Sequence, residues 1–323
     1  MTKKDLRIIF MGTPEFAVET LKALVENDYN VVAVVTQPDK PVGRHQTEMQ
    51  PSQVKQYAVA HGLPVLQPEK MKDPEFVEQL RSYNANLQVV VAFRMLPEVV
   101  WAMPEYGTFN VHAALLPQYR GAAPINWAVI NGETQTGVTT FFLDHDIDTG
   151  RIILKKTFDI PDEADVEYVY DGLMHLGAEI CLETLEAIIA ANGHPDSIPQ
   201  DSVLDGSAIK PAPKIFKETC EIDWQKTAKQ VYDFVRGLSP YPGAWTTLVA
   251  PDGKETVLKI YKTRKTGKPG KGIGTITIEG KALCVSAADE QLEIVELQLA
   301  GKKRMMARDF LNGMKQIEDY RVK

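Results

Sequence analysis

The strongest constraint on the fold is an alternation, along residues 1–195, of short apolar runs with segments whose apolar residues recur at helical spacing. The runs predict strands at Leu6–Met11, Val31–Thr36, Leu87–Phe93, Thr108–Val111, Val138–Leu143 and Ile152–Phe158. The other segments predict helices at Pro14–Glu26, Ser52–His61, Pro74–Tyr83, Ala123–Ile130 and Val166–Ala191. Apolar strands interleaved with amphipathic helices are typical of an α/β fold, here a mostly parallel sheet with helices on both faces.

The pattern changes in the last third of the chain. Residues 196–213 contain several prolines and little periodicity, which is typical of a linker. A helix is expected at Lys226–Leu238, and strands separated by turn residues are expected at Ala244–Val249, Thr256–Tyr261, Gly272–Ile278, Ala282–Ser286 and Leu292–Leu299. Strands that begin about every 8–12 residues suggest a small antiparallel, OB-like β-barrel. We therefore expect a catalytic-looking domain at 1–195, a linker at 196–213 and a barrel at 214–323.

Charge is distributed unevenly between the two parts. The whole chain carries a formal net charge of −7. Residues 1–205 hold 15 Lys and Arg against 29 Asp and Glu, a net −14, whereas residues 206–323 hold 21 against 14, a net +7. The asymmetry favours a phosphate-bearing partner on the basic part. Lysines that merely keep a small β domain soluble explain it equally well, so charge alone leaves both interpretations open.

Composition and motifs exclude several classes of protein. The balance of 44% hydrophobic and 24% charged residues argues against a disordered chain, and no apolar run approaches the roughly 18 residues of a membrane helix. Cys181, Cys220 and Cys284 are odd in number and widely spaced, which excludes a disulfide framework or thiolate zinc site and fits the cytoplasm. Gly12 at the first strand–helix turn belongs to neither a dinucleotide fingerprint nor a P-loop, so an ordinary turn suffices for it.

Two polar side chains at the end of a predicted strand form the first candidate site. Asn110 and His112 are two residues apart, so a strand places both on one face. They also lie near the carboxyl end of a parallel strand, where open α/β sheets bind their ligands. A lone histidine is more often structural, but an asparagine and a histidine together at this position favour a functional site.

A second candidate segment contains Asp144, His145, Asp146 and Asp148. Such a cluster could suggest a metal site. It lacks the glycine and glutamate positions of an EF-hand, and no second carboxylate cluster is present to complete a coordination shell. A simpler interpretation is that one aspartate orients His112 and stabilises its imidazolium during proton transfer. The pattern does not indicate which aspartate does so.

Short segments spread over essentially the whole chain carry a family resemblance. They are Ile8–Phe16, Thr36–Pro41, Val90–Phe93, Asn110–His112, Leu115–Pro117, Arg120–Ile125, Asp146–Gly150, Pro240–Pro242 and Ala300–Lys303. Through them the sequence resembles the methionyl-tRNA formyltransferase family. The asparagine, histidine and aspartate are shared by many folate-dependent formyltransferases, whereas the first loop and the barrel segments are more specific to the tRNA-acting branch. The resemblance thus implies a formyltransferase-like catalytic domain followed by a tRNA-binding barrel.

The resemblance also implies roles for individual residues. The family's catalytic residues fall on Asn110, His112 and Asp148. Its tetrahydrofolate-binding stretch falls on Ala114, Leu115, Leu116 and Pro117. Ala114 occupies a position where the family usually has serine, so a hydroxyl contact is absent and backbone contacts of Leu115–Pro117 must suffice.

The expected tRNA contacts are less regular. The family's tRNA-contacting loop falls on residues 43–48, where many members are more basic; here Arg44 is almost the only cation and Glu48 opposes it. In the barrel, Lys302, Lys303 and Arg304 are candidate phosphate contacts. A second group of candidates, expected between strands, comprises Lys262, Arg264, Lys265, Lys268 and Lys271.

The implied reaction moves a formyl group from N10 of 10-formyltetrahydrofolate to the α-amino group of methionine on initiator tRNA. His112 would accept the amine proton, Asn110 would stabilise the formyl oxygen, and imidazolium or a water held by Asp148 would return a proton to N10. The resemblance implies no metal, and we expect a cytoplasmic monomer. Two alternatives stay open: a formyltransferase or hydrolase with a small-molecule amine or water as acceptor, and a nucleic-acid-binding protein without catalytic activity.

Overall fold

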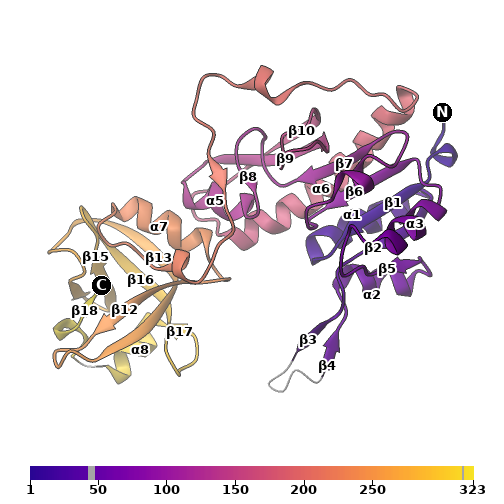
Figure 1. The fold of residues 1–323 in the computed structure, drawn as a ribbon. Coiled ribbons are helices and arrows are strands. Elements are labelled where there is room, and N and C mark those ends of the chain that lie inside the picture. Colours follow the sequence, from indigo (N-terminus) through magenta and orange to yellow (C-terminus); the bar gives the residue numbers. More distant parts are fainter. Residues whose placement is uncertain (43–47, 315) are drawn as a thin grey trace. The chain divides into compact units, whose positions relative to one another are not determined.

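The computed structural model describes residues 1–42, 48–314 and 316–323, and its contacts divide the chain into two compact units (Figure 1). The N-terminal unit comprises Met1–Gly121, Thr136–Phe158 and Tyr170–Pro211, and the C-terminal unit comprises Ala122–Gln135, Asp159–Val169 and Ala212–Lys323. The domain ranges expected from the sequence are continuous, whereas these units are not. Two segments from the expected first domain, 122–135 and 159–169, pack with the barrel.

Hydrogen bonds to helix α7 (Ala228–Gly237) account for this grouping. The Asn126 amide donates to the Gly237 carbonyl, the Tyr232 hydroxyl donates to the Asp162 carbonyl, and the Arg236 guanidinium donates to the Ala164 carbonyl; each bond is 2.9 Å long. Long-range contacts of this kind leave no local pattern in a sequence, so the composite unit could not be anticipated.

The N-terminal unit is built on a seven-stranded sheet in the order β10-β9-β7-β6-β1-β2-β5. Its strands are β1 Ile8–Gly12, β2 Val31–Val35, β5 Val65–Leu66, β6 Leu87–Val91, β7 Thr108–His112, β9 Gln135–Phe142 and β10 Ile152–Asp159. The five neighbouring strands β7, β6, β1, β2 and β5 run parallel to one another, and β9 is antiparallel to β7. Both β1 and β6 are buried along their whole length, which explains why they read as continuous apolar runs.

Helices cover both faces of this sheet, as the sequence predicted. The helices of the first part of the chain are α1 Glu15–Glu26, α2 Gln53–Ala60, α3 Pro74–Ser82, α4 Glu98–Trp101 and α6 Val166–Ala190. On one face, Phe76 of α3 and Val100 of α4 share a buried cluster with Ile9 and Val90. On the other, Gly177 of α6 packs against Val111 of β7. The expected helix starts also hold, because Ser52 and Asp73 accept hydrogen bonds as N-caps.

Gly12, at the turn from β1 into α1, has a packing role. A Cβ placed there would lie 2.6 Å from the Cβ of Ala17 and 2.9 Å from the carbonyl oxygen of Val91. Only glycine therefore allows α1 to follow β1 this closely. The interpretation of Gly12 as an ordinary strand–helix turn is consistent with this contact.

The C-terminal unit contains a second sheet, in the order β14-β15-β16-β13-β12-β18, with β17 paired to β16. Its elements are α5 Pro124–Ile130, α7, β12 Ala244–Val249, β13 Glu255–Pro269, β14 Ile276–Glu279, β15 Ala282–Ser286, β16 Glu290–Leu299, β17 Met305–Met306, α8 Ala307–Gly313 and β18 Arg321–Val322. Neighbouring strands are antiparallel. An isolated bridge between Thr275 and Arg321 links the two outer strands, so the sheet curls back on itself. The predicted antiparallel barrel-like domain is confirmed.

Several short elements were not predicted, and three differences from the expectation concern the candidate residues. Strand β13 continues to Pro269, so the cations from Lys262 to Lys268 lie in a strand and the expectation of a loop was wrong. The exposed lysines hid the strand, because only Thr263 on the opposite face is buried. The hairpin of β3 (Lys40–Val42) and β4 (Glu48–Gln50) was not predicted and projects from the N-terminal unit (Figure 1). The proline-rich segment after residue 195 contains a 3₁₀ turn at Gln200–Val203 and strand β11 (Pro211–Ala212), which pairs with β8 (Arg120–Gly121).

Among the residues that the structure describes, no helix is both long enough and apolar enough to cross a membrane.

Candidate active site

Strand β7 places two polar side chains beside each other at its carboxyl end. Asn110 pairs with Val90 of β6 and Phe141 of β9, while Phe109 and Val111 on either side of it are buried. Asn110 is half-buried, and its side-chain amide makes no hydrogen bond to any described residue. The amide is therefore available to donate to a bound molecule.

His112 is buried, and one hydrogen bond determines its proton positions. Its Nε2 lies 2.9 Å from the carbonyl oxygen of Tyr119, which can only accept. Nε2 must therefore carry a hydrogen, and in the neutral imidazole Nδ1 holds the free lone pair. Tyr119 turns its carbonyl toward His112 from a left-handed backbone conformation, with φ of 61°. The imidazole is thus held with a basic nitrogen on its other side.

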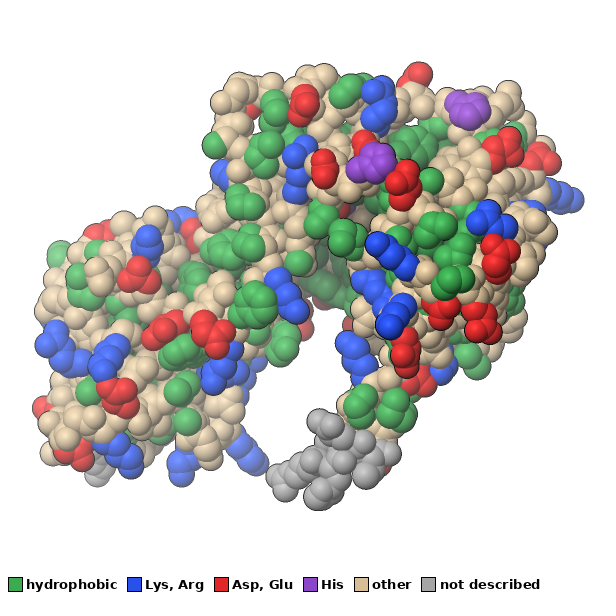
Figure 2. Space-filling view, in the orientation of Figure 1, with side chains coloured by type: hydrophobic (Ala, Val, Ile, Leu, Met, Phe, Trp, Pro, Cys, Tyr) green, Lys and Arg blue, Asp and Glu red, His purple; other side chains and the backbone are tan. Residues whose placement is uncertain are grey.

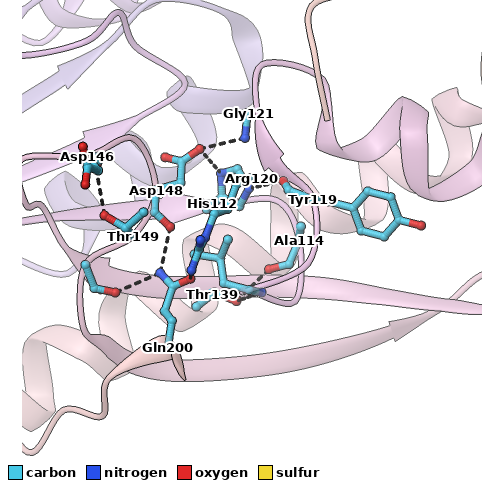
Figure 3. Close-up of polar contacts among 12 residues, drawn as sticks. His112, Ala114, Tyr119, Arg120, Gly121, Thr139, Asp146, Asp148, Thr149 and Gln200 are labelled. Carbon is cyan, nitrogen blue, oxygen red and sulfur yellow. Dashed lines mark hydrogen bonds and ion pairs between the residues drawn. The ribbon is translucent and has the colours of Figure 1, made fainter. Parts of the chain in front are cut away.

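Asp148 faces that basic nitrogen. Its Oδ2 lies 3.9 Å from His112 Nδ1 and accepts a hydrogen bond of 2.9 Å from the backbone N–H of Gly121 (Figure 3). The distance is too long for a direct hydrogen bond to the imidazole but short enough for strong attraction once Nδ1 is protonated. The side chains are only 7% and 12% exposed, so water screens this attraction weakly.

Residue patterns alone do not rank the three aspartates, of which the family resemblance favours Asp148, and burial separates them in the structure. Asp144 and Asp146 are exposed, and neither is paired with His112. The Asp144 carboxylate accepts from the N–H of His145, a local loop contact. Only Asp148 of the three approaches His112. Within the described part of the chain, no group of three or more His, Cys, Asp or Glu side chains is placed to hold a metal ion.

The segment expected to bind folate follows β7 directly. Ala114, Leu116 and Pro117 are buried and Leu115 is half-buried. The hydroxyl of Thr139 on β9 donates to the Ala114 carbonyl at 2.6 Å and accepts from the Leu116 N–H at 3.1 Å. Two of the backbone groups in this segment are therefore used within the protein, which narrows the backbone contacts left for a ligand. The folate assignment of these four residues stays a prediction.

Two side chains that the sequence did not suggest complete the surroundings of Asp148. Gln200 comes from the proline-rich segment, is 2% exposed, and donates from Nε2 to the carbonyls of Asp148 and Gly150. Its Oε1 accepts two hydrogen bonds from the guanidinium of Arg120. Nothing in a stretch without periodicity points to a buried glutamine. Arg120 lies in a segment that carried the resemblance, but no role was expected for it.

The comparisons with known proteins agree with this geometry. Residues 6–185 match the family model described as formyl transferase, and residues 214–315 match that of the formyl transferase C-terminal domain. The chain is 59% identical over its full length to the methionyl-tRNA formyltransferase of Parabacteroides distasonis, covering that protein completely. It is 55% identical to that of Bacteroides fragilis, with 100% and 99% of the two chains aligned, and 48% identical to that of Porphyromonas gingivalis over 97% of each.

The chain belongs to the methionyl-tRNA formyltransferase family.

Solved structures extend the fold comparison. The chain resembles HypX from Aquifex aeolicus in complex with tetrahydrofolic acid with a TM-score of 0.62 at 20% identity, over 96% of this chain and 48% of that one. It resembles the sugar 3N-formyl transferase WlaRD, solved with dTDP and 5-N-formyl-THF, with a TM-score of 0.63 at 17% identity, over 92% and 99% of the chains. At these identities the likeness establishes the fold alone.

Some of the cations predicted to contact tRNA already form ion pairs with carboxylates of the protein, and others do not. Arg44 lies outside the described residues. The guanidinium of Arg304 pairs with the Glu296 carboxylate at 2.6 and 2.8 Å and stacks over the ring of Tyr261. Lys302 and Lys303 are exposed, and no described carboxylate lies within ion-pair distance of either.

The second group of candidates is mostly paired. Arg264 pairs with Glu293, Lys265 with Asp162, and both Lys268 and Lys271 with Glu279; Lys262 pairs with no described carboxylate. Figure 2 shows the same mixture, with basic and acidic side chains interspersed over the C-terminal unit (left). Most of these candidate cations are therefore already paired with a neighbouring carboxylate.

The cysteines give a first prediction. Cys181, Cys220 and Cys284 are buried, and burial raises the pKa of each thiol above its ordinary value. Few thiolates are therefore present at neutral pH, and the folded protein should resist alkylation by iodoacetamide. Intact-mass measurement should show no adduct and formyl transfer should persist, whereas all three cysteines should react in guanidinium. Rapid loss of activity on alkylation of the folded protein would place a thiol in the reaction.

Proposed function

We propose that this protein transfers the formyl group of 10-formyltetrahydrofolate to the α-amino group of methionine esterified to initiator tRNA, in the cytoplasm. The observation that carries the proposal is the basic Nδ1 of His112, which faces the carboxylate of Asp148 beside the free amide of Asn110. The names of relatives that align over the full chain support this choice of acceptor.

Proton transfer is the role proposed for His112. The α-amine attacks the formyl carbon as a neutral nucleophile, and the new C–N bond leaves a positive charge on that nitrogen. Nδ1 of His112 accepts the proton, because Nε2 is already occupied by its bond to Tyr119. General-base assistance of this kind contributes about 10²–10⁴-fold to the rate.

Charge stabilisation is the role proposed for Asn110 and Asp148. The formyl oxygen becomes negative in the tetrahedral intermediate, and the Asn110 amide can donate to it. Losing such a donor typically costs about 2.7–4 kcal/mol. The carboxylate of Asp148 stabilises the imidazolium of His112, which then returns its proton to N10 as the C–N10 bond breaks. Tetrahydrofolate and formylated methionyl-tRNA leave, and the histidine is again neutral.

One assay tests the proposed function against its alternatives. Consumption of 10-formyltetrahydrofolate is followed spectroscopically with and without methionyl initiator tRNA. We expect rapid consumption only when charged tRNA is present, with one formyl group transferred per folate consumed. Equal consumption without tRNA would indicate a hydrolase, transfer to an amino sugar only would indicate a small-molecule acceptor, and no consumption at all would leave a nucleic-acid-binding protein.

The unpaired lysines give the second prediction, that changing Lys302 and Lys303 to alanine raises the KM for tRNA. Each lysine that contacts a phosphate releases counterions when tRNA binds. The slope of log affinity against log salt concentration should therefore become shallower by about one for each lysine removed. The KM for the folate donor should not change, because its predicted site lies in the N-terminal unit. The measurement is KM for tRNA at several salt concentrations.

A charge-matched control distinguishes contacts from net charge. Changing Lys268 and Lys271 to alanine removes the same two charges from the same unit, but both lysines already pair with Glu279. We expect this control to keep the wild-type salt slope. An unaltered slope in the Lys302–Lys303 variant, or the same change in both variants, would contradict the assignment of those two lysines.

A further inference from the structure

Gln200 forms a fully bonded bridge next to the candidate catalytic residues. Its Nε2 lies 2.7 Å from the Asp148 carbonyl and 2.9 Å from the Gly150 carbonyl, and its Oε1 lies 3.0 and 2.7 Å from Nε and Nη2 of Arg120. Figure 3 shows the glutamine reaching toward the backbone of the Asp148 loop. Both donors and both acceptor positions of this buried amide are thus occupied.

The bonds from Nε2 hold an unusual backbone conformation. Asp148 has a φ of 56°, which lies in the left-handed region that residues other than glycine rarely adopt. Because the amide nitrogen of Gln200 bonds to the carbonyls of Asp148 and Gly150, it fixes the peptide group that follows Asp148 and the one that follows Gly150. The direction of the Asp148 side chain follows from this backbone conformation.

The bonds to Oε1 come from Arg120, whose two neighbours in the chain contact His112 and Asp148. Arg120 lies between Tyr119, whose carbonyl accepts from His112, and Gly121, whose N–H donates to Asp148. One side chain therefore bonds to the backbone of the Asp148 loop and to the guanidinium of Arg120, the residue between the two backbone groups that contact His112 and Asp148. A glutamine that served only to anchor the proline-rich segment would need no contact with the Asp148 loop or with Arg120.

We propose that Gln200 is a positioning residue, which sets the distance and direction of the Asp148 carboxylate relative to His112 Nδ1. The inference rests on the proposed function, because it concerns the same reaction. It predicts an effect on the chemical step rather than on binding, since Gln200 is buried and bonds only to protein groups.

The third prediction follows for Gln200→Ala. Because displacement of a catalytic group by about 1 Å can cost 10²-fold, kcat should fall about 10–100-fold while both KM values stay within about two-fold. Gln200→Glu should likewise lower kcat and leave both KM values nearly unchanged. Its carboxylate keeps the bond to Arg120 but cannot donate to the two carbonyls. This second variant retains the side-chain volume, so it tests the proposal even if the alanine variant does not fold.

Two comparisons separate positioning from anchoring. Gln118 bonds to the same proline-rich segment, accepting from the Lys210 N–H at 2.7 Å, and its hydrogen-bond partners in the described chain do not include Asp148 or Gly150, because its amide nitrogen instead faces Ser207 and Ala208. Gln118→Ala should therefore keep near-normal kcat. In an Asp148→Asn background, Gln200→Ala should add less than about a three-fold loss, because the carboxylate that it positions is already absent.

The proposal is overturned if either Gln200 variant that folds keeps kcat within about two-fold of wild type. It is also overturned if Gln118→Ala lowers kcat as much as Gln200→Ala does. A double variant whose loss of kcat equals the product of the losses from Gln200→Ala and Asp148→Asn would overturn it as well. These outcomes differ from failure of the proposed function, in which the wild-type protein itself would not formylate methionyl-tRNA.

Discussion

Replacing His112 with alanine is expected to lower kcat about 10²–10⁴-fold while leaving the KM for the folate donor nearly unchanged. The side chain is buried, its Nε2–H is bonded to the Tyr119 carbonyl, and its Nδ1 faces Asp148. Removing it takes away the only side-chain base observed beside Asp148 in the described part of the chain. The measurement is steady-state turnover with charged initiator tRNA, together with folate binding at equilibrium.

His145 supplies the control for this prediction. It is exposed, lies 3.8 Å from the carboxylate of Glu98, and sits edge-on to the ring of Trp101. His145→Ala removes a histidine from the neighbouring loop without touching the His112–Asp148 pair, so kcat should stay near the wild-type value. Near-normal turnover by His112→Ala, or an equal loss in both variants, would remove His112 from the mechanism.

The second large effect is expected for Asp148→Asn, which should lower kcat about 10²–10⁴-fold because it removes the charge that stabilises imidazolium. Asparagine is well suited to the left-handed backbone at φ of 56°. Its amide oxygen can also still accept from the Gly121 N–H, a bond now made by Asp148 Oδ2. The substitution therefore keeps the loop and deletes the charge.

Asp144→Asn is the matched control for the aspartate prediction. Asp144 lies four residues earlier in the same loop and is exposed, and among the described residues its carboxylate bonds only to the neighbouring N–H of His145. Its conversion to asparagine should change kcat less than about two-fold, since exposed charges interact weakly with distant groups. Equal damage from the two substitutions would mean that the wrong aspartate has been assigned, and elemental analysis for a bound metal would then be the next measurement.

Local patterns predicted the elements that carry the site, because these elements are buried regularly. Strand β7 was expected at Thr108–Val111 and is observed at Thr108–His112, and its two-residue period placed Asn110 and His112 on one face. Helix α3 was expected at Pro74–Tyr83 from the helical spacing of its apolar residues and is observed at Pro74–Ser82. The catalytic roles of Asn110, His112 and Asp148 stay predictions that the substitutions above will test.

Patterns failed where long-range contacts replace periodicity. Gln200 lies in a proline-rich stretch that is mostly exposed, and the glutamine itself is buried because it packs on the Asp148 loop. Strand β13 runs eight residues past its expected end at Tyr261, since its lysines point outward and only one face is covered. The pairing of Arg304 with Glu296 of β16 was not predicted either, because it forms only when the segment after Arg304 pairs with β16 as strand β17.

The sequence by itself determined the sheet, the barrel-like domain and the family, because burial periodicity and short motifs are local properties of a chain. It also presented Asn110 and His112 together, since strand geometry follows directly from residue spacing. The family resemblance already favoured Asp148, and the structure shows that Asp148 rather than Asp144 faces His112. Only the tertiary structure decided that Nδ1 rather than Nε2 is the basic nitrogen and that Gln200 bonds to the aspartate loop. Each of these depends on contacts between groups that are not neighbours in the sequence, and such contacts exist only once the chain has folded.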